Sequence, residues 1–293
     1  MNQADGQAAR LEEHRPHLRA VAYRMLGSLA EADDAVQDAW LRYSRADTSA
    51  VDNLGGWLTT VVARVCLNML RTRRGRREEE LPNRLPDPIV SAEGGPDPEQ
   101  EVLLADAVGL AMQVVVETLS PAERVAFVLH DVFGMPFDEI APIVGKSPTA
   151  ARQLASRARR RVQGSHAQPD ADLREQRAVV DAFFAAARRG DLQALIAILD
   201  PDVVVRADFG PSSTAPRESH GAEAVAQQAL SFRQLAPFAR PAMVNGTPGF
   251  VVMRGGAPFS VLGFTVRGGR IVELDVVADP DRLQRLDLSV LDD

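Results

Sequence analysis

Residues 120–162 read SPAERVAFVLHDVFGMPFDEIAPIVGKSPTAARQLASRARRRV, a pattern of three short helices in which the last two are spaced as a helix-turn-helix. Ser120 and Glu123 have the spacing of a capping box, which opens the first helix. Gly145 stops the second helix, and Ser147-Pro148 begins the third directly afterwards as N-cap and first helical residue. This tight break favours a helix-turn-helix over an ordinary helical bundle.

The third helix of this stretch has two different faces. Small apolar residues lie on one side, and the other side carries Arg, Gln, Ser and Thr with no acidic residue. Arg and Gln can pair bidentately with base edges in the DNA major groove, and the other groups can contact phosphates. A solvated, arginine-rich surface helix is the alternative, but the pattern favours DNA binding. The outward residues are Thr149, Arg152, Gln153, Ser156 and Arg157, followed by Arg159-Arg160-Arg161.

Length and composition restrict the class of protein. A chain of 293 residues with 45% hydrophobic residues can form two or three domains of the usual ~100–150 residues. No apolar run approaches the ~20 residues of a membrane span, and the polar start is not a signal peptide. The single cysteine, Cys66, excludes an internal disulfide framework and a Cys-based metal cluster. We expect a cytoplasmic protein with no metal, no cofactor and no membrane contact.

The charge is unevenly distributed. The formal net charge is −7, which by itself disfavours nucleic acid, but binding depends on the local field near the phosphates. Two basic clusters make such binding compatible with an acidic chain. They are Arg64, Arg71, Arg73, Arg74, Arg76 and Arg77 in the first, and Lys146, Arg152, Arg157 and Arg159 to Arg161 in the second.

Residues 10–77 have the pattern of a compact helical domain. Ser28 and Glu31 form a second capping box, and the helix that follows is apolar on one side and acidic on the other. A later helix directs its apolar stripe inward and carries Arg64 and Asn68 outside that stripe. Two kinds of partner surface, or simple solvation of both faces, are equally compatible with this periodicity.

Two segments resemble a known family. LRAVAYRMLGSLAEADDAVQDAWLRY (18–43) and NLGGWLTTVVARVCLNMLRTRRGRR (53–77) resemble region two of bacterial sigma factors in their extracytoplasmic-function (ECF) form. Residues 120–162 resemble region four of the same family, and we place that helical domain at 105–163. Two matches in the right order, joined by a linker, are far more specific than a helix-turn-helix alone.

The resemblance implies partners and residue roles. Its partners are promoter DNA and the clamp helices of core RNA polymerase, and opening a duplex requires bases to leave the stack. The resemblance assigns polymerase contact to Asp34, Gln37 and Asp38. It assigns the promoter −10 element to Trp57, Thr60, Arg64, Asn68 and Arg71. It assigns the −35 element to Ser147, Thr149, Arg152, Gln153, Ser156 and Arg157.

Residues 78–104 separate the two helical domains. Three glutamates, several prolines and Gly94-Gly95 predict an extended, flexible linker, which is long enough to span promoter elements some tens of ångströms apart. Leu85-Pro86-Asp87-Pro88 resembles the Trp-Leu-Pro-Glu-Pro segment that follows region two in sigma factors with a C-terminal extension. Arg84 stands where that segment has tryptophan. A second, shorter break is expected at residues 164–172.

Residues 173–293 have the pattern of a third domain, of α+β class. Helices around 173–190, 192–199 and 222–232 accompany strands near 203–208, 242–244, 249–254, 259–267 and 270–278, and Gly268-Gly269 marks a hairpin. This order resembles the SnoaL-like, ketosteroid-isomerase-like cone domains, which enclose a pocket. The fold class is therefore two all-α sigma domains followed by an α+β cone.

Two motifs in the third domain resemble those linked to regulation in one group of sigma factors. The first is reduced to Asp208-Phe209-Gly210, with Arg217 downstream, and the second is Asp279-Pro280-Asp281-Arg282-Leu283. The resemblance implies regulation in cis, through contact between the C-terminal domain and the sigma domains, with a small-molecule ligand in the cone pocket as a further candidate partner. The residues assigned to it are Asp208, Gly210, Asp279, Pro280, Asp281, Arg282 and Leu283.

Cone folds also support enzymes that use buried carboxylates as general bases. Candidate groups are Asp208, Asp275 and His220, with Arg206 and Arg254 as partners. The resemblance supplies no matched catalytic set, and fold does not imply function, so a sensing or contact-making domain is favoured. We therefore predict an ECF sigma factor that is not an enzyme. The alternative is a helix-turn-helix regulator with a ligand-binding or enzymatic SnoaL-like domain.

Overall fold

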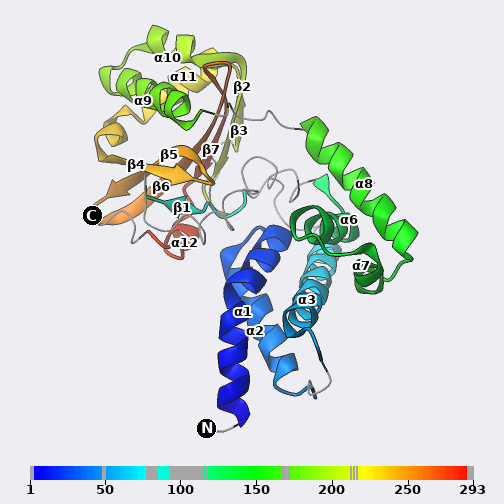
Figure 1. The fold of residues 1–293 in the computed structure, drawn as a ribbon. Coiled ribbons are helices and arrows are strands. Elements are labelled where there is room, and N and C mark those ends of the chain that lie inside the picture. The colour runs from blue at the N-terminus through cyan, green and yellow to red at the C-terminus, as the bar shows by residue number, and fades with distance from the viewer. Residues whose placement is uncertain are drawn as a thin grey trace. The chain divides into compact units, whose positions relative to one another are not determined.

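The computed structural model describes residues 3–47, 51–76, 85–92, 115, 118–165, 170, 172–211, 213, 215 and 217–288 (Figure 1). The chain divides into two compact units. The first comprises Met1–Leu81 and Ala111–His166, and the second comprises Pro82–Leu110 and Ala167–Asp293. Among the described residues, no helix has the length and apolar character that crossing a membrane requires.

Three long helices begin the first unit. Leu29 opens the second of them after Ser28, whose side chain accepts a hydrogen bond from the backbone N–H of Glu31, as the capping-box spacing predicts. The apolar stripes of the three helices meet in a core that includes the fully buried Tyr23 and Tyr43. The helices are α1 (Gln3–Leu26), α2 (Leu29–Tyr43) and α3 (Leu54–Arg76).

Four further elements of the first unit lie among its described residues. The capping box of Ser120 and Glu123 is present, and Gly145 ends the second helix of the predicted helix-turn-helix with a φ of 70°. The Ser147 hydroxyl accepts a hydrogen bond from the Ala150 N–H at 3.2 Å, which confirms its predicted place at the start of the third helix. A π-helical turn between the first two helices was not predicted. The elements are α6 (Pro121–Phe127), η1 (Val128–Val132), α7 (Phe137–Val144) and α8 (Pro148–Ser165).

The two helical groups of the first unit pack against each other. Arg124 on α6 is 3% exposed and donates a hydrogen bond to the Met25 carbonyl on α1 at 2.9 Å. The Phe133 ring meets His17 edge-on, with centroids 5.2 Å apart, and lies 5.4 Å from the Arg24 guanidinium. Burial, and then the nearby His14, lower the pKa of His17. Sequence periodicity identified each helical group but gave no indication of this contact.

The second unit is built on one seven-stranded sheet in the order β1-β4-β5-β6-β7-β2-β3. The β2–β7 pair is parallel and the remaining pairs are antiparallel. Its strands are β1 (Val90–Ser91), β2 (Leu199–Asp208), β3 (Glu218–His220), β4 (Ala239–Val244), β5 (Thr247–Arg254), β6 (Ala257–Arg267) and β7 (Arg270–Val277). Its helices are α9 (Leu173–Arg189), α10 (Leu192–Ile198), α11 (Ala222–Ser231), η2 (Arg233–Phe238) and α12 (Pro280–Leu283).

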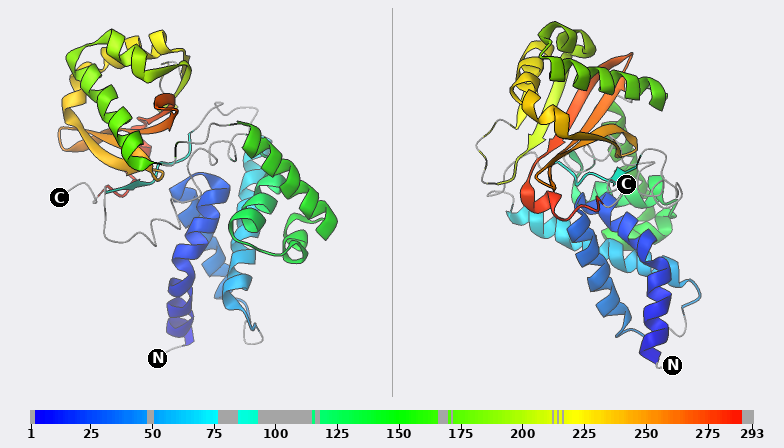
Figure 2. Two further views of the ribbon diagram at one scale, coloured as in Figure 1. Left: turned by 45° about the horizontal axis from the view of Figure 1, so that its top comes forward. Right: turned by 90° about the vertical axis from the view of Figure 1, so that its left-hand side faces the viewer.

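Successive side chains along each strand point to opposite faces of the sheet. Both faces carry a core of apolar residues. Helices α9, α10 and α11 cover one face (Figure 2), and Phe183, Phe184, Phe250 and Phe264 lie in the core beneath them. A smaller core on the other face contains valines of β4 to β7 together with Leu283 of α12. The predicted helices and long strands are confirmed, whereas β3, η2 and α12 were not predicted.

The prediction of an extended, flexible linker is wrong for residues 85–92, because residues of this segment pack on the sheet of the second unit. Val90 pairs with Val244, so that β1 is an edge strand of the sheet, and Leu85 is buried in the smaller core. Asn245, in the β4–β5 turn with a φ of 53°, accepts a hydrogen bond from the Ile89 N–H at 2.9 Å and donates its own N–H to the Ile89 carbonyl at 2.8 Å. Apolar side chains and backbone pairing place this segment on the second unit. Residues 93–104 lie outside the described residues.

Candidate functional site

The outward face of α8 is exposed, as predicted for a helix that enters the major groove. Ser147, Thr149, Gln153 and Ser156 point away from the core of the first unit. The Arg152 guanidinium lies 5.3 Å from the centroid of the Phe137 ring on α7, so a residue of the preceding helix orients it. The helix buries Ala151, Leu154, Ala155 and Ala158.

Part of the basic charge of α8 is neutralised within the first unit. Glu123 on α6 lies 3.4 Å from Arg157 and 2.9 Å from Arg161, and Asp131 pairs with Arg159. Burial alone would raise the pKa of Glu123, but hydrogen bonds from Ser120 and the charges of Arg161 and Arg157 lower it. These pairs were not predicted from the sequence, because the acids lie 28 to 38 positions before their arginines.

The residues assigned to the −10 element share one stripe of α3. Their spacing of three or four residues places them on one face of a helix, and Arg64, Asn68 and Arg71 are exposed on it. Trp57 is half-buried, and its ring centroid lies 6.0 Å from that of Tyr43 on α2. The Thr60 hydroxyl donates to the Gly56 carbonyl at 3.0 Å. The stripe therefore begins with a fixed aromatic ring and continues with exposed polar and basic groups.

The acidic face of α2 is also exposed. Asp34 and Gln37 extend into solvent, and Asp38 forms an ion pair with Arg42 at 3.1 Å, one helical turn further along. Such an i,i+4 pair contributes only about 0.3–0.5 kcal/mol, so Asp38 can exchange it for another cationic partner. The two helix faces predicted to have different partners carry opposite charge.

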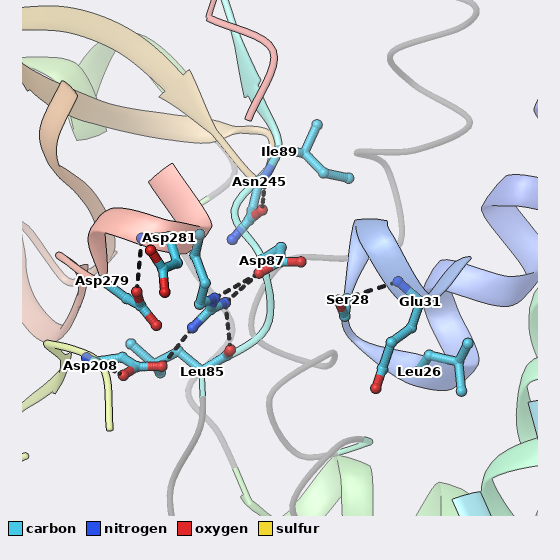
Figure 3. A network of polar contacts seen from close by, with 12 residues as sticks. Leu26, Ser28, Glu31, Leu85, Asp87, Ile89, Asp208, Asn245, Asp279 and Asp281 are labelled. Carbon is cyan, nitrogen blue, oxygen red and sulfur yellow. Dashed lines mark hydrogen bonds and ion pairs between the residues drawn. The ribbon is translucent and has the colours of Figure 1, made fainter. Parts of the chain in front are cut away.

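The two C-terminal motifs meet at Arg282. This side chain is 4% exposed, and its Nη1 donates to Asp208 Oδ2 at 2.5 Å. Its Nε donates to Asp87 Oδ1 at 2.7 Å, and its Nη2 donates to the Leu85 carbonyl at 2.8 Å. Figure 3 shows Asp208, Leu85 and Asp87 gathered around these contacts. We call Leu85, Asp87, Asp208 and Arg282 the Arg282 network.

Neighbouring residues complete the Arg282 network. Arg217 lies 3.3 Å from Asp208 Oδ1 and donates to the Gly210 carbonyl at 2.8 Å. The Gly210 N–H donates to Asp208 at 3.0 Å, and its φ of 84° suits glycine. Asp279 caps α12 by accepting from the Asp281 N–H at 3.0 Å (Figure 3). The reduced first motif thus keeps the carboxylate that the second motif contacts.

The candidate catalytic groups are not brought together. Asp208 belongs to the Arg282 network, and Asp275 lies 3.7 Å from Arg206 on the sheet face opposite to Leu274 and Val276. His220 is exposed beside Glu218 at the sheet edge. Arg254 lies 5.8 Å from the ring centroid of Phe259.

Among the described residues, no metal-binding cluster adds to this set, and the Cys66 thiol is buried. The described part of the chain holds no group of three or more His, Cys, Asp or Glu residues able to bind a metal ion. Burial raises the pKa of the Cys66 thiol to about 12, which disfavours the reactive thiolate. Cys66 is completely buried as a small residue of the helical core.

Comparison with known proteins identifies the two helical groups. Residues 11–76 match the family Sigma-70 region 2, and residues 110–162 match Sigma-70, region 4. The chain is 40% identical to the ECF RNA polymerase sigma factor SigJ of Mycobacterium tuberculosis, over 94% of this chain and 93% of that protein. The chain belongs to the extracytoplasmic-function sigma factors. This family is not enzymatic, and its members bind core RNA polymerase and promoter DNA.

The similarity extends through the C-terminal domain of this sigma factor. The chain is 34% identical to the probable ECF RNA polymerase sigma factor SigI of Mycobacterium tuberculosis, over 98% of both chains. The crystal structure of Mycobacterium tuberculosis SigJ superposes with a TM-score of 0.75 at 35% identity, covering 96% of this chain and 99% of that one. The predicted order of helical region two, helical region four and an α+β NTF2/ketosteroid-isomerase-like domain is confirmed.

Proposed function

We propose that this sigma factor directs core RNA polymerase to specific promoters in the cytoplasm through three exposed faces of its first unit. The acidic face of α2 would contact the polymerase clamp helices, since it is exposed and its one i,i+4 ion pair is weak. The stripe of α3 from Trp57 to Arg71 would read the −10 element. The outward face of α8 would read the −35 element, which its arginine and glutamine side chains suit.

We propose further that the C-terminal domain regulates promoter output in cis by retaining the linker between regions two and four. The Arg282 network carries this proposal, because it joins two linker residues to both C-terminal motifs. Removing one partner of a buried ion pair strongly destabilises the folded protein, because the other charge is left buried without compensation. The linker would therefore be either docked with its ion pair formed or released, and these two forms would be distinct states. The strand pairing of β1 with β4 supports the docked state.

Retention of the linker is expected to restrain the sigma factor. Regions two and four must reach promoter elements some tens of ångströms apart, and an extended chain supplies at most about 3.3–3.6 Å per residue. Docking residues 85–91 removes part of this reach. The buried contact of Arg124 with Met25 must also open if the two regions separate. Release of the linker would therefore favour the open, promoter-bound form.

Run-off transcription with purified core polymerase tests the proposal. The template carries the promoter upstream of the protein's own gene, and the proteins are the full chain, a chain truncated after Gly164, Arg282→Ala and Arg285→Ala. Arg285 is exposed and lies three residues beyond Arg282, so it provides a matched control. Promoter-specific transcript from the full chain, increased by Arg282→Ala and by truncation but not by Arg285→Ala, is the expected result. No transcript and no co-elution with core polymerase would overturn promoter direction, and equal output from all four proteins would overturn regulation in cis.

A helix-turn-helix regulator with an enzymatic C-terminal domain is the weaker candidate. Its best test is turnover abolished by Asp208→Asn or Asp275→Asn. The burial of Asp208 in an ion-paired network, and the position of Asp275 on the sheet face away from Leu274, disfavour both groups as general bases.

A further inference from the structure

The helix-covered face of the sheet encloses a cavity of about 120 Å³ in the second unit. Its lining contains five phenylalanines, Phe183, Phe184, Phe209, Phe232 and Phe259, with aliphatic residues between them. Phe232 and Phe259 are 46% and 36% exposed, which places them where the cavity meets solvent. An apolar cavity of about 150 Å³ stays dry and binds benzene, so this cavity has the capacity for a single aromatic ring.

The polar groups of the cavity restrict the ligand further. Of the described residues that line it, three are polar, namely Gln228, Arg233 and Ser260, and none is acidic. Arg233 is exposed, so solvent screens its charge. A charged group in the apolar interior would lose its hydration without a buried charged partner to replace it, whereas Gln228 and Ser260 can pair with one neutral hydroxyl. The lining therefore favours an uncharged, single-ring aromatic molecule with one hydroxyl group.

We propose that this cavity is a binding site for such a phenol-like molecule, and that its occupancy is coupled to docking of residues 85–91. The coupling rests on the proposed regulation in cis, whereas the binding site stands without it. The ligand would be bound and not transformed, since no candidate base faces the cavity.

The wall of the cavity is continuous with the Arg282 network. Ala207 and Phe209 line the cavity, and Asp208 between them directs its carboxylate to Arg282. Ala278 also lines the cavity, and its N–H donates to the Asp208 carbonyl at 2.7 Å. Asp279, the next residue, caps the helix that carries Arg282. Two of the three chain segments that bear the network, those of Asp208 and Arg282, therefore adjoin the ligand site.

This continuity fixes the sign of the coupling. Phe209 lies in the cavity wall while Asp208 is paired with Arg282, so the ligand site is complete in the form that retains the linker. A ligand that binds this form preferentially stabilises it, and by reciprocity the retained linker raises the affinity for the ligand. The ligand is thus expected to strengthen linker retention and to lower promoter output.

Isothermal titration calorimetry of the full chain tests the site. The probes are p-cresol, the anion 4-toluate and the cation 4-methylbenzylamine. Saturable binding of p-cresol, and weaker or no binding of the two ions, is the expected result. No saturable binding of p-cresol would overturn the site, and equal or tighter binding of either ion would overturn the ligand class.

Matched variants locate the bound molecule. Ala229→Leu fills the cavity from α11, whereas Ala224→Leu makes the same change on the exposed side of that helix. Ala229→Leu is expected to lose p-cresol binding and Ala224→Leu to retain it. If Ala229→Leu does not fold, Phe259→Ala serves instead, because it removes a partly exposed wall residue and is expected to weaken binding in a folded chain. Undiminished binding by the folded wall variant would overturn the location.

Hydrogen exchange of the full chain tests the coupling separately. Saturating p-cresol is expected to slow exchange of the amides in residues 85–91, and Arg282→Ala is expected to weaken p-cresol binding at least about fivefold. If p-cresol binds but does not change the exchange of residues 85–91, and if Arg282→Ala does not change the affinity for p-cresol, the coupling is overturned. The binding site itself would still stand. If the ligand binds and Arg282→Ala leaves transcription unchanged, the proposed regulation in cis is overturned. The proposed binding site is not affected by that result.

Discussion

Arg282 donates to the carboxylate of Asp87, 195 positions earlier in the chain, at 2.7 Å in a buried site. This contact joins the linker between two DNA-reading regions to the last helix of a separate domain. Because Asp208 accepts from the same guanidinium at 2.5 Å, one cation pairs with two buried carboxylates, and Arg217 is a second cation beside Asp208. The charge balance of the C-terminal domain therefore depends on where the linker lies.

Arg282→Ala is expected to destabilise the second unit by about 3–5 kcal/mol, because the buried Asp87 loses its Arg282 partner and the buried Asp208 keeps only Arg217. Thermal unfolding of the full chain, in which the transition of the second unit shifts to lower temperature, measures the effect. Arg285→Ala should change stability by less than about 0.5 kcal/mol. Arg282→Lys should recover only part of the loss, since an ammonium group does not reproduce the planar guanidinium fork. Equal stability of the Ala variant and the parent chain would show that the network contributes nothing.

Arg124→Ala is expected to loosen the contact between regions two and four. The change removes a buried hydrogen bond to the Met25 carbonyl and leaves that acceptor unsatisfied, at a cost of about 1–3 kcal/mol. Hydrogen exchange at the end of α1 and in η1 should become faster. Arg160 is exposed on α8, so Arg160→Ala should not change hydrogen exchange at the end of α1 or in η1. Similar exchange in both variants would show that Arg124 does not stabilise this contact.

Much of the first unit follows from local sequence rules. The N-cap Ser28, the capping box of Ser120 and the left-handed Gly145 depend on residues within one helical turn, so a single sequence determines them. The stripe of α3 and the outward face of α8 follow from helical periodicity for the same reason. The roles of the side chains on those faces remain predictions, since periodicity places a residue without naming its partner.

The contacts between distant residues could not be predicted. Asp87 lies in a segment rich in proline and charge, and its composition indicates a tether because nothing local reveals a partner near the C-terminus. Whether Asp275 faced the pocket or the opposite side depended on strand register, which the pairing of Arg206 with Asp275 on adjacent strands β2 and β7 resolves. Glu123 was predicted as a helix cap, and its pairing with Arg157 and Arg161 is a tertiary feature.

Arg157→Ala is expected to weaken binding to a −35 duplex by about 1–3 kcal/mol if its guanidinium reads a base. To do so Arg157 must exchange its 3.4 Å contact with Glu123 for DNA, and its half-exposed side chain permits this exchange. Fluorescence anisotropy with the full chain at fixed salt measures the affinity. Arg174→Ala, exposed on α9 of the second unit, is the control. Unchanged affinity for the Arg157 variant would remove this residue from the interface.

Acid should weaken the packing of α6 against α8. The pKa of Glu123 is lower in the folded chain than its ordinary value near 4.5, so its ionised form contributes stability that is present above about pH 4.5 and is lost as pH falls through the folded pKa. Glu123→Gln should be less stable than the parent chain at neutral pH, and the difference should shrink as pH falls through that range. A difference that does not vary with pH would contradict the ionic role. Thermal unfolding measured across this range gives the comparison.

The most direct test of the central claim is the promoter-specific transcript formed with core polymerase by Arg282→Ala and by Arg285→Ala at equal concentrations of folded protein. Linker retention by the C-terminal domain predicts more transcript from Arg282→Ala than from the parent chain, and parental output from Arg285→Ala. Parental output from both variants, with hydrogen exchange showing that Arg282→Ala has released residues 85–91, would contradict the account.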